Sequence, residues 1–149
     1  LHQLLAKFLF QKLNEFVESH RLGFVLFAPS PVHLGPDNYR QPDIVYFRPD
    51  RINQGQEYPE LVDLAMEIVS ADAKSQKRDY EEKRMVYAAA GIPEYWIIDP
   101  QTQTVTVLAL DGKEYRIHGE FKPGAQATSV LLDGFAIDVA ALFAAGTSI

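Results

Sequence analysis

The chain has 149 residues, 47% of them hydrophobic and 23% charged, and it contains no cysteine. This size and composition predict a single domain, residues 1–149, with one hydrophobic core. The lack of cysteine excludes disulfides, cysteine nucleophiles and zinc–thiolate sites. The formal net charge of −6 argues against a protein that holds nucleic acid through a broad basic surface. No apolar run reaches membrane-spanning length and no signal-peptide pattern is present, which predicts a cytoplasmic protein without a membrane segment.

The first part of the chain predicts a helix followed by short strands. Apolar residues recur at helical spacing over residues 1–20, which indicates an amphipathic helix that covers a sheet. The strand predictions that follow are residues 23–28, 32–34 and 40–47, with prolines and a turn signal at residues 35–38 between them. Residues 50–59 are polar and predict a surface loop.

The middle of the chain predicts a strand, a helix and a second strand. Residues 61–69 are apolar on both alternating faces, as in a strand that is covered on both sides. The next helix is expected to begin after Ser70 or Asp72 as N-cap and to end at Gly91. Residues 95–98 form a further short apolar strand.

The last third of the chain predicts a hairpin and a closing helix. Residues 104–110 and 113–117 alternate in polarity around Asp111-Gly112, which is typical of a β-hairpin. Residues 129–132 predict another strand, and Asp138 is the expected N-cap of a short final helix. The order of elements predicts an α/β fold with a mixed central sheet flanked by helices, a C-terminal β-hairpin and a short final helix.

Two ionisable residues stand where this pattern predicts covered positions, and a third can lie at the edge of a covered surface. Glu67 lies inside the long apolar run, and Lys83 lies on the apolar face of the following helix, between two tyrosines. Asp43 opens the apolar strand upstream of them. An unpaired charge taken out of water is costly, so we expect these groups to contact one another, a bound ion, or both.

The segments around these residues resemble a known family. They are Pro42-Asp43, the strand with Glu67 that ends in Ser70, the helix with Lys83 and Tyr87, and Gly91-Ile92-Pro93-Glu94-Tyr95-Trp96-Ile97-Ile98-Asp99-Pro100. Together they resemble the Uma2 family of endonuclease-like proteins, within the PD-(D/E)XK nuclease-like superfamily. The resemblance runs over nearly the whole chain, and its last segment is the most specific. It implies a restriction-endonuclease-like core.

The resemblance also implies a metal-dependent endonuclease that hydrolyses phosphodiester bonds in DNA. By the family pattern Asp43 and Glu67 are metal-binding acids, the backbone carbonyl of Ile68 is a further ligand, and Lys83 is the catalytic lysine. In the parent superfamily the lysine lies two residues after the second acid, where this chain has Val69. Uma2-like sequences place it on the following helix, and Lys83 is the matching residue.

The expected metal is Mg²⁺ or Mn²⁺, because these hard ions prefer oxygen ligands and keep several waters. In nuclease-like folds an acid from the first helix sometimes reaches the metal, and Glu15 is the candidate here. Cutting both strands of DNA requires two sites, which favours a homodimer.

Two alternatives stay open at this point. In the first, Glu67 and Lys83 form a buried ion pair and Asp43 caps a strand, in a domain without catalytic activity. In the second, the chain is an inactive nucleic-acid- or protein-binding module on a nuclease-like fold. The acidic net charge and the displaced lysine lend weight to the second alternative.

Overall fold

The computed structural model describes residues 1–29, 31–35 and 38–147. The elements in chain order are α1 (His2–Ser19), β1 (Phe24–Phe27), β2 (Val32–Gly35), β3 (Asn38–Arg40), β4 (Ile44–Phe47), a 3₁₀ turn (Pro49–Arg51), β5 (Leu64–Ile68), α2 (Ala73–Lys77), a π-helical turn (Arg78–Glu82), α3 (Lys83–Ala90), β6 (Glu94–Asp99), β7 (Thr104–Asp111), β8 (Glu114–Phe121), β9 (Gln126–Thr128), β10 (Ala136–Asp138) and α4 (Val139–Ala145). The predicted α/β class, with a C-terminal hairpin and a short final helix, is confirmed.

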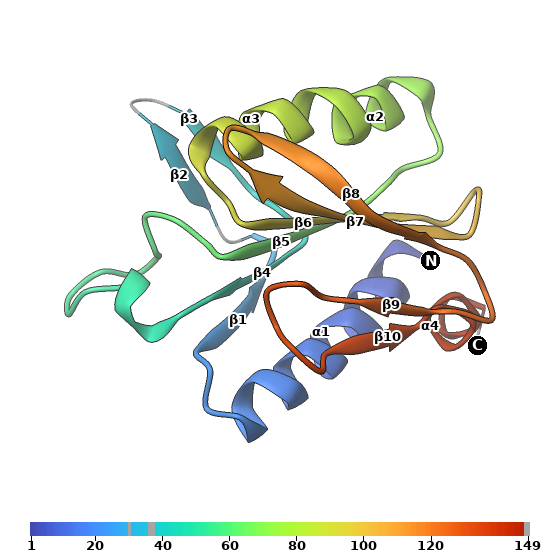
Figure 1. The fold of residues 1–149 in the computed structure, drawn as a ribbon, viewed down its shortest axis with the longest axis horizontal. Helices are drawn as coiled ribbons and strands as arrows, with labels where there is room; N and C mark the ends of the chain where they lie inside the picture. Colours follow the sequence, from blue (N-terminus) through green and yellow to red (C-terminus); the bar gives the residue numbers. More distant parts are fainter. Residues whose placement is uncertain (30, 36–37, 148–149) are drawn as a thin grey trace.

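A mixed sheet of six strands, in the order β1-β4-β5-β6-β7-β8, forms the centre of the molecule (Figure 1). Strands β5 and β6 are parallel, and the other neighbouring pairs are antiparallel. A parallel pair needs a crossover connection, and the helical segment of α2 and α3 supplies it. This segment therefore packs on the sheet directly over the strand that carries Glu67.

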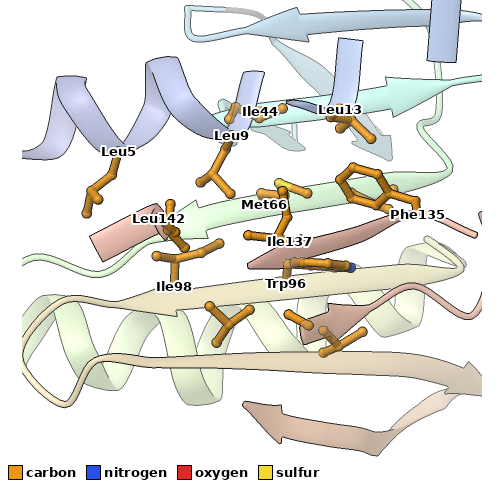
Figure 2. Packing of buried hydrophobic residues seen from close by; sticks show 14 of the residues in the cluster. Leu5, Leu9, Leu13, Ile44, Met66, Trp96, Ile98, Phe135, Ile137 and Leu142 are labelled. Carbon is orange, nitrogen blue, oxygen red and sulfur yellow. The ribbon is translucent and has the colours of Figure 1, made fainter. Parts of the chain in front are cut away.

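The two faces of the sheet carry separate hydrophobic cores. On one face, α1, α4 and the small β9–β10 pair cover the sheet, and Trp96 packs there with Leu9 and Phe135 (Figures 1 and 2). On the other face, α3 covers the sheet, and Tyr87 and Tyr95 lie in contact as an edge-to-face pair. Residues of β5 alternate between these cores, which explains why the segment 61–69 carries apolar side chains on both of its alternating faces.

The crossover helix begins and ends where the sequence predicts, but its middle differs. The side chain of Asp72 caps the start by accepting a hydrogen bond from the Ser75 backbone N–H, and Gly91 ends the helix with φ of 85°. Between these ends, residues 78–82 form a π-helical turn, in which the Lys83 N–H bonds to the Arg78 carbonyl five residues earlier. Such turns are frequent at functional sites.

One strand prediction upstream of the site is wrong. Residues 40–47 are not one strand, because β3 ends at Arg40 and β4 begins at Ile44, so Asp43 lies just before β4 rather than within a strand. The two central residues of the turn predicted at 35–38 lie outside the described residues. Among the helices of the described residues, none combines the length and apolarity required to cross a bilayer.

Residues 129–132 also do not form a strand, because a buried acid binds their polar groups. The carboxylate of Glu94, which is 1% exposed, accepts hydrogen bonds from the backbone N–H groups of Val130 and Leu131 and from the Ser129 hydroxyl. The indole N–H of Trp96 donates a fourth. A carboxylate with this many donors fixes the segment as a loop over the beginning of β6.

Candidate functional site

The first two predicted acids are linked across neighbouring strands. Strands β4 and β5 pair with Ile44 opposite Met66, which places Asp43 beside the end of β5. The Asp43 Oδ2 atom accepts a hydrogen bond of 2.7 Å from the Ile68 N–H, and Glu67 Oε1 accepts one of 3.3 Å from the Asp43 N–H. The backbone thus holds the two carboxyl groups side by side at one end of the sheet.

Glu67 points into the core between the sheet and α3 and is 2% exposed. Its Oε2 atom accepts a 2.9 Å hydrogen bond from the Tyr87 hydroxyl and lies 2.6 Å from the Lys83 Nζ atom. Burial raises the pKa of Glu67 to about 7, and Asp43 adds to this effect while Lys83 opposes it. Burial and the Glu67 charge also raise the pKa of Tyr87, so its hydroxyl remains a donor.

Lys83 lies between two carboxylates. Its Nζ atom is 2.6 Å from Glu67 Oε2 and 2.8 Å from Asp79 Oδ1, and its side chain is 18% exposed. Burial favours loss of the ammonium proton, but Glu67 and Asp79 outweigh this effect and the pKa of Lys83 is raised. The lysine is therefore held as a cation in a fixed position.

Asp79 is the member of this cluster that sequence reasoning missed. It lies in the π-helical turn, is 4% exposed, and burial raises its pKa against the opposing effect of Lys83. Its backbone carbonyl accepts a 2.8 Å hydrogen bond from the Tyr95 hydroxyl, which ties this turn to β6. A signal was present in the sequence, because an acid four residues before a misplaced lysine lies on the same helical face.

The first helix meets the site at its start and not near its end. The His2 Nε2 atom lies 3.1 Å from Asp43 Oδ1, and the histidine side chain is 49% exposed. Glu15, the candidate acid of this helix, is exposed and lies beside Lys12 and Gly134. About thirteen residues of helix separate it from His2, or about 20 Å. The structure therefore does not bring Glu15 to the other predicted site residues.

The donor set suits a hard divalent ion whose coordination is completed by water and phosphate. Asp43 and Glu67 offer carboxylate oxygens, and the Ile68 carbonyl points to the same strand edge as its N–H, which binds Asp43. Over residues 1–29, 31–35 and 38–147, no three His, Asp or Glu side chains lie close enough together to form a metal cage. Mg²⁺ does not need such a cage, because it is commonly bound by one or two carboxylates and the phosphates of a substrate.

Two other buried acids have purely structural partners. Asp63 binds the Arg51 guanidinium at 2.8 Å, and Asp99 accepts a 2.8 Å hydrogen bond from the Tyr80 hydroxyl. Glu67 differs from both, because its Oε1 atom accepts a hydrogen bond from the backbone N–H of a second acid, Asp43, whose side chain is 17% exposed. The arrangement is a pair of acids, one buried and one partly exposed, with an ammonium group bound to the buried acid.

Comparisons with known proteins identify a family and a similar fold for this chain. Residues 1–140 match the Uma2 family model, which carries the description "Putative restriction endonuclease". The fold is similar to the crystal structure of "a putative nuclease belonging to DUF820" from Anabaena variabilis, with a TM-score of 0.77 and 22% sequence identity. That match covers 97% of this chain and 80% of the other. A search of curated proteins found no match.

Proposed function

This chain belongs to the Uma2 family of restriction-endonuclease-like proteins, and from that premise we propose that it is a metal-dependent endonuclease acting on DNA. The reaction is hydrolysis of a phosphodiester bond. The observation that carries the proposal is the convergence of Asp43, Glu67 and Lys83 at one end of the sheet, although they come from three separate segments of the chain. Two acids and a fixed cation are the groups that phosphodiester hydrolysis with a divalent ion requires.

Asp43, Glu67 and the Ile68 carbonyl are the groups that would hold Mg²⁺ or Mn²⁺. Such an ion, when bound, polarises the scissile phosphate and lowers the pKa of a coordinated water. Both carboxyl groups must be ionised to bind it, so they attract a cation only after Glu67 has lost its proton. The Tyr87 hydroxyl and Lys83 assist this loss, because each binds Oε2 of the ionised form.

Lys83 supplies the positive charge on the chain itself. Its ammonium group, next to Glu67, can orient the attacking water or neutralise the charge that develops on the phosphate oxygens. Asp79 acts as a positioning residue, because its 2.8 Å contact fixes the Lys83 ammonium from a second side. Asp79 and Lys83 are four residues apart, so both side chains lie on one face of the helical segment.

Metal binding tests the acid pair without knowledge of the substrate. Calorimetric titration of Mn²⁺ into the protein should give saturable binding that Asp43→Asn abolishes. Glu57→Gln, a change of an exposed acid in the loop before β5, is the matched control and should leave the binding intact. Loss of binding in the control as well, or equal binding in Asp43→Asn, contradicts the assignment.

Cleavage tests the reaction. Supercoiled plasmid DNA with Mg²⁺ or Mn²⁺ should be nicked or linearised by the protein and left intact by Glu67→Gln, with circular dichroism confirming that the variant folds. Unchanged cleavage by Glu67→Gln rules out the proposed chemistry. Cutting of both strands requires two active sites, and we therefore expect a homodimer during turnover. Analytical ultracentrifugation of the protein with its DNA substrate measures this oligomeric state.

A second candidate function is a binding module that has kept the fold without the activity. The net charge of −6 and the existing ion pair between Glu67 and Lys83 are the observations that favour it. DNA binding that does not respond to metal, together with no cleavage, would support this second function.

A further inference from the structure

A cavity lies beside Asp43, one of the two proposed metal-binding acids. Its volume is about 620 Å³, within the range of small-molecule sites, and Asp43 forms part of its wall. The other lining residues come from the first three turns of α1 and from the end of β1, which run beside each other (Figure 1): His2, Gln3, Ala6, Lys7, Phe10, Gln11, Phe27 and Ala28. Its surface is mainly apolar, unlike the acid pair next to it.

Two aromatic rings form the apolar part of this cavity. Phe10 and Phe27 pack edge to face with centroids 4.9 Å apart, and Phe27 is 60% exposed. An exposed phenylalanine at the mouth of a cavity presents a flat ring to whatever enters it. Rings presented in this way stack on nucleobases in proteins that bind single strands.

The backbone fixes Phe27 near Asp43. Phe27 is paired with Ile44 in the sheet, and the next residue, Ala28, donates a 3.0 Å hydrogen bond from its N–H to the Asp43 carbonyl. A phosphate at Asp43 would therefore have its adjoining nucleoside within reach of the Phe27 ring. Because Phe27 is linked through the backbone to Asp43, it differs from the isolated exposed apolar residues that any protein surface contains.

Polar side chains border the cavity on its helical side. Gln3, Lys7 and Gln11 are spaced four residues apart, so they form one ridge along α1. A glutamine amide carries both donors and an acceptor, and a base edge presents both as well. Lys7 is exposed and offers a positive charge to a neighbouring phosphate.

We propose that this cavity binds an unpaired nucleobase next to the scissile phosphate, so that the preferred substrate is single-stranded or locally unpaired DNA. The role of this cavity in cleavage rests on the proposed endonuclease function, whereas binding of the base can be measured without cleavage. A protein with a net charge of −6 cannot obtain its affinity for DNA from phosphate contacts alone. Stacking of a base on an aromatic ring adds binding energy that does not depend on the charge of the protein.

The test is fluorescence anisotropy with a labelled oligothymidine of about twelve nucleotides and the corresponding duplex, in EDTA so that no strand is cut. The single strand should bind more tightly than the duplex. Phe27→Ala should raise the dissociation constant for the single strand about tenfold, and Phe27→Trp should restore binding because it keeps a flat ring. Phe24→Ala is the matched control, because Phe24 is also exposed on β1 but packs against Phe47 on the opposite face.

A second variant keeps the test valid if Phe27→Ala unfolds. Lys7→Gln, at an exposed helical position, should weaken binding and reduce the slope of log affinity against log salt concentration by about 0.7. Equal affinity for duplex and single strand, or equal binding by Phe27→Ala, Lys7→Gln and the wild type, overturns the proposal. If the single strand binds in a way that depends on Phe27 but the protein cleaves no DNA, the nucleobase site is supported and the proposed catalytic function is rejected. If the protein cleaves DNA but Phe27→Ala binds the single strand as well as the wild type does, the catalytic function is supported and the nucleobase site is rejected.

Discussion

The Nζ atom of Lys83 lies 2.6 Å from the Oε2 atom of Glu67, although one residue is on the crossover helix and the other is on a strand of the central sheet. The contact explains why a charged residue is tolerated at each of two covered positions. It also makes each residue dependent on the other, because removal of one charge leaves the other buried without its partner.

This dependence predicts the effect of Lys83→Met on stability. The change leaves Glu67 and Asp79 close together without the cation between them, so we expect the free energy of unfolding to fall by about 3 kcal/mol at pH 8. At pH 5 the loss should be smaller, because both acids can then take up a proton. Urea unfolding at the two pH values measures the difference.

The double variant Glu67→Leu/Lys83→Met is the control for that experiment. It removes both charges of the pair, so it should recover part of the stability lost in Lys83→Met. It should remain below the wild type, because Asp79 and the Tyr87 hydroxyl lose their partners. A double variant as stable as the wild type would support a purely structural ion pair.

The raised pKa of Glu67 predicts how stability depends on pH. The folded protein holds the Glu67 proton up to about pH 7, whereas an unfolded glutamate loses it near its ordinary value of 4.5. The folded state therefore binds more protons between these values, and this contribution to stability is full below pH 4.5 and is lost as the pH rises through 7. The free energy of unfolding should fall by at most about 3 kcal/mol over this range, measured by urea titration.

The Glu67→Gln variant checks the assignment of that pH dependence. An amide side chain does not titrate, so the variant should show a flatter profile between pH 4.5 and about 7. A small slope should remain, because the pKa of Asp79 is also raised by burial. Profiles of equal slope in the two proteins would mean that another group is responsible.

Periodicity and capping signals predicted most of the fold because they act locally. The amphipathic α1, the Asp72 N-cap, the Gly91 terminus and the Asp111-Gly112 hairpin each depend on a few neighbouring residues. The strand predicted at residues 129–132 was wrong because its polar groups bind Glu94, which is 35 residues or more away. Propensity alone contains no information about such a distant partner.

The candidate site was predicted unevenly for a similar reason. Glu67 and Lys83 stood out because they interrupt apolar patterns, and the structure joins them. Asp79 was missed although it lies four residues before Lys83 and so on the same helical face, because it stands in a run of charged residues that resembles a solvated surface. Neither the His2 contact with Asp43 nor the distance of Glu15 follows from helical periodicity, which fixes the face of a helix but not which end meets the site.

Replacement of the buried carboxylate of Glu94 should strongly lower the free energy of unfolding without changing the affinity of the proposed site for metal. It accepts four hydrogen bonds, and Glu94→Gln replaces one acceptor oxygen with an NH₂ group that faces donors. We expect a loss of about 2 to 3 kcal/mol in the free energy of unfolding. Thermal unfolding measures it, with Glu114→Gln at an exposed position as control. Mn²⁺ affinity should not change in the folded fraction.

Asp79→Asn tests the positioning of Lys83 separately from metal binding. The asparagine keeps an oxygen near the Lys83 ammonium but removes the charge that holds it, while the Tyr95 hydroxyl still binds the backbone carbonyl of residue 79. We expect the cleavage rate to fall about tenfold or more, with Mn²⁺ affinity unchanged because Asp79 is not among the proposed ligands. The pH at which activity is lost on the alkaline side should also move down, because the Lys83 ammonium gives up its proton more easily when one of its two carboxylates is gone.

Asp72→Asn, at the N-cap of the same helix, is the control for Asp79→Asn. It should leave the cleavage rate, the Mn²⁺ affinity and the pH profile unchanged, since asparagine caps a helix as well as aspartate does. A fall in the cleavage rate of Asp79→Asn that is accompanied by an equal fall in Mn²⁺ affinity, with no change in the pH profile, would instead place Asp79 in the metal site.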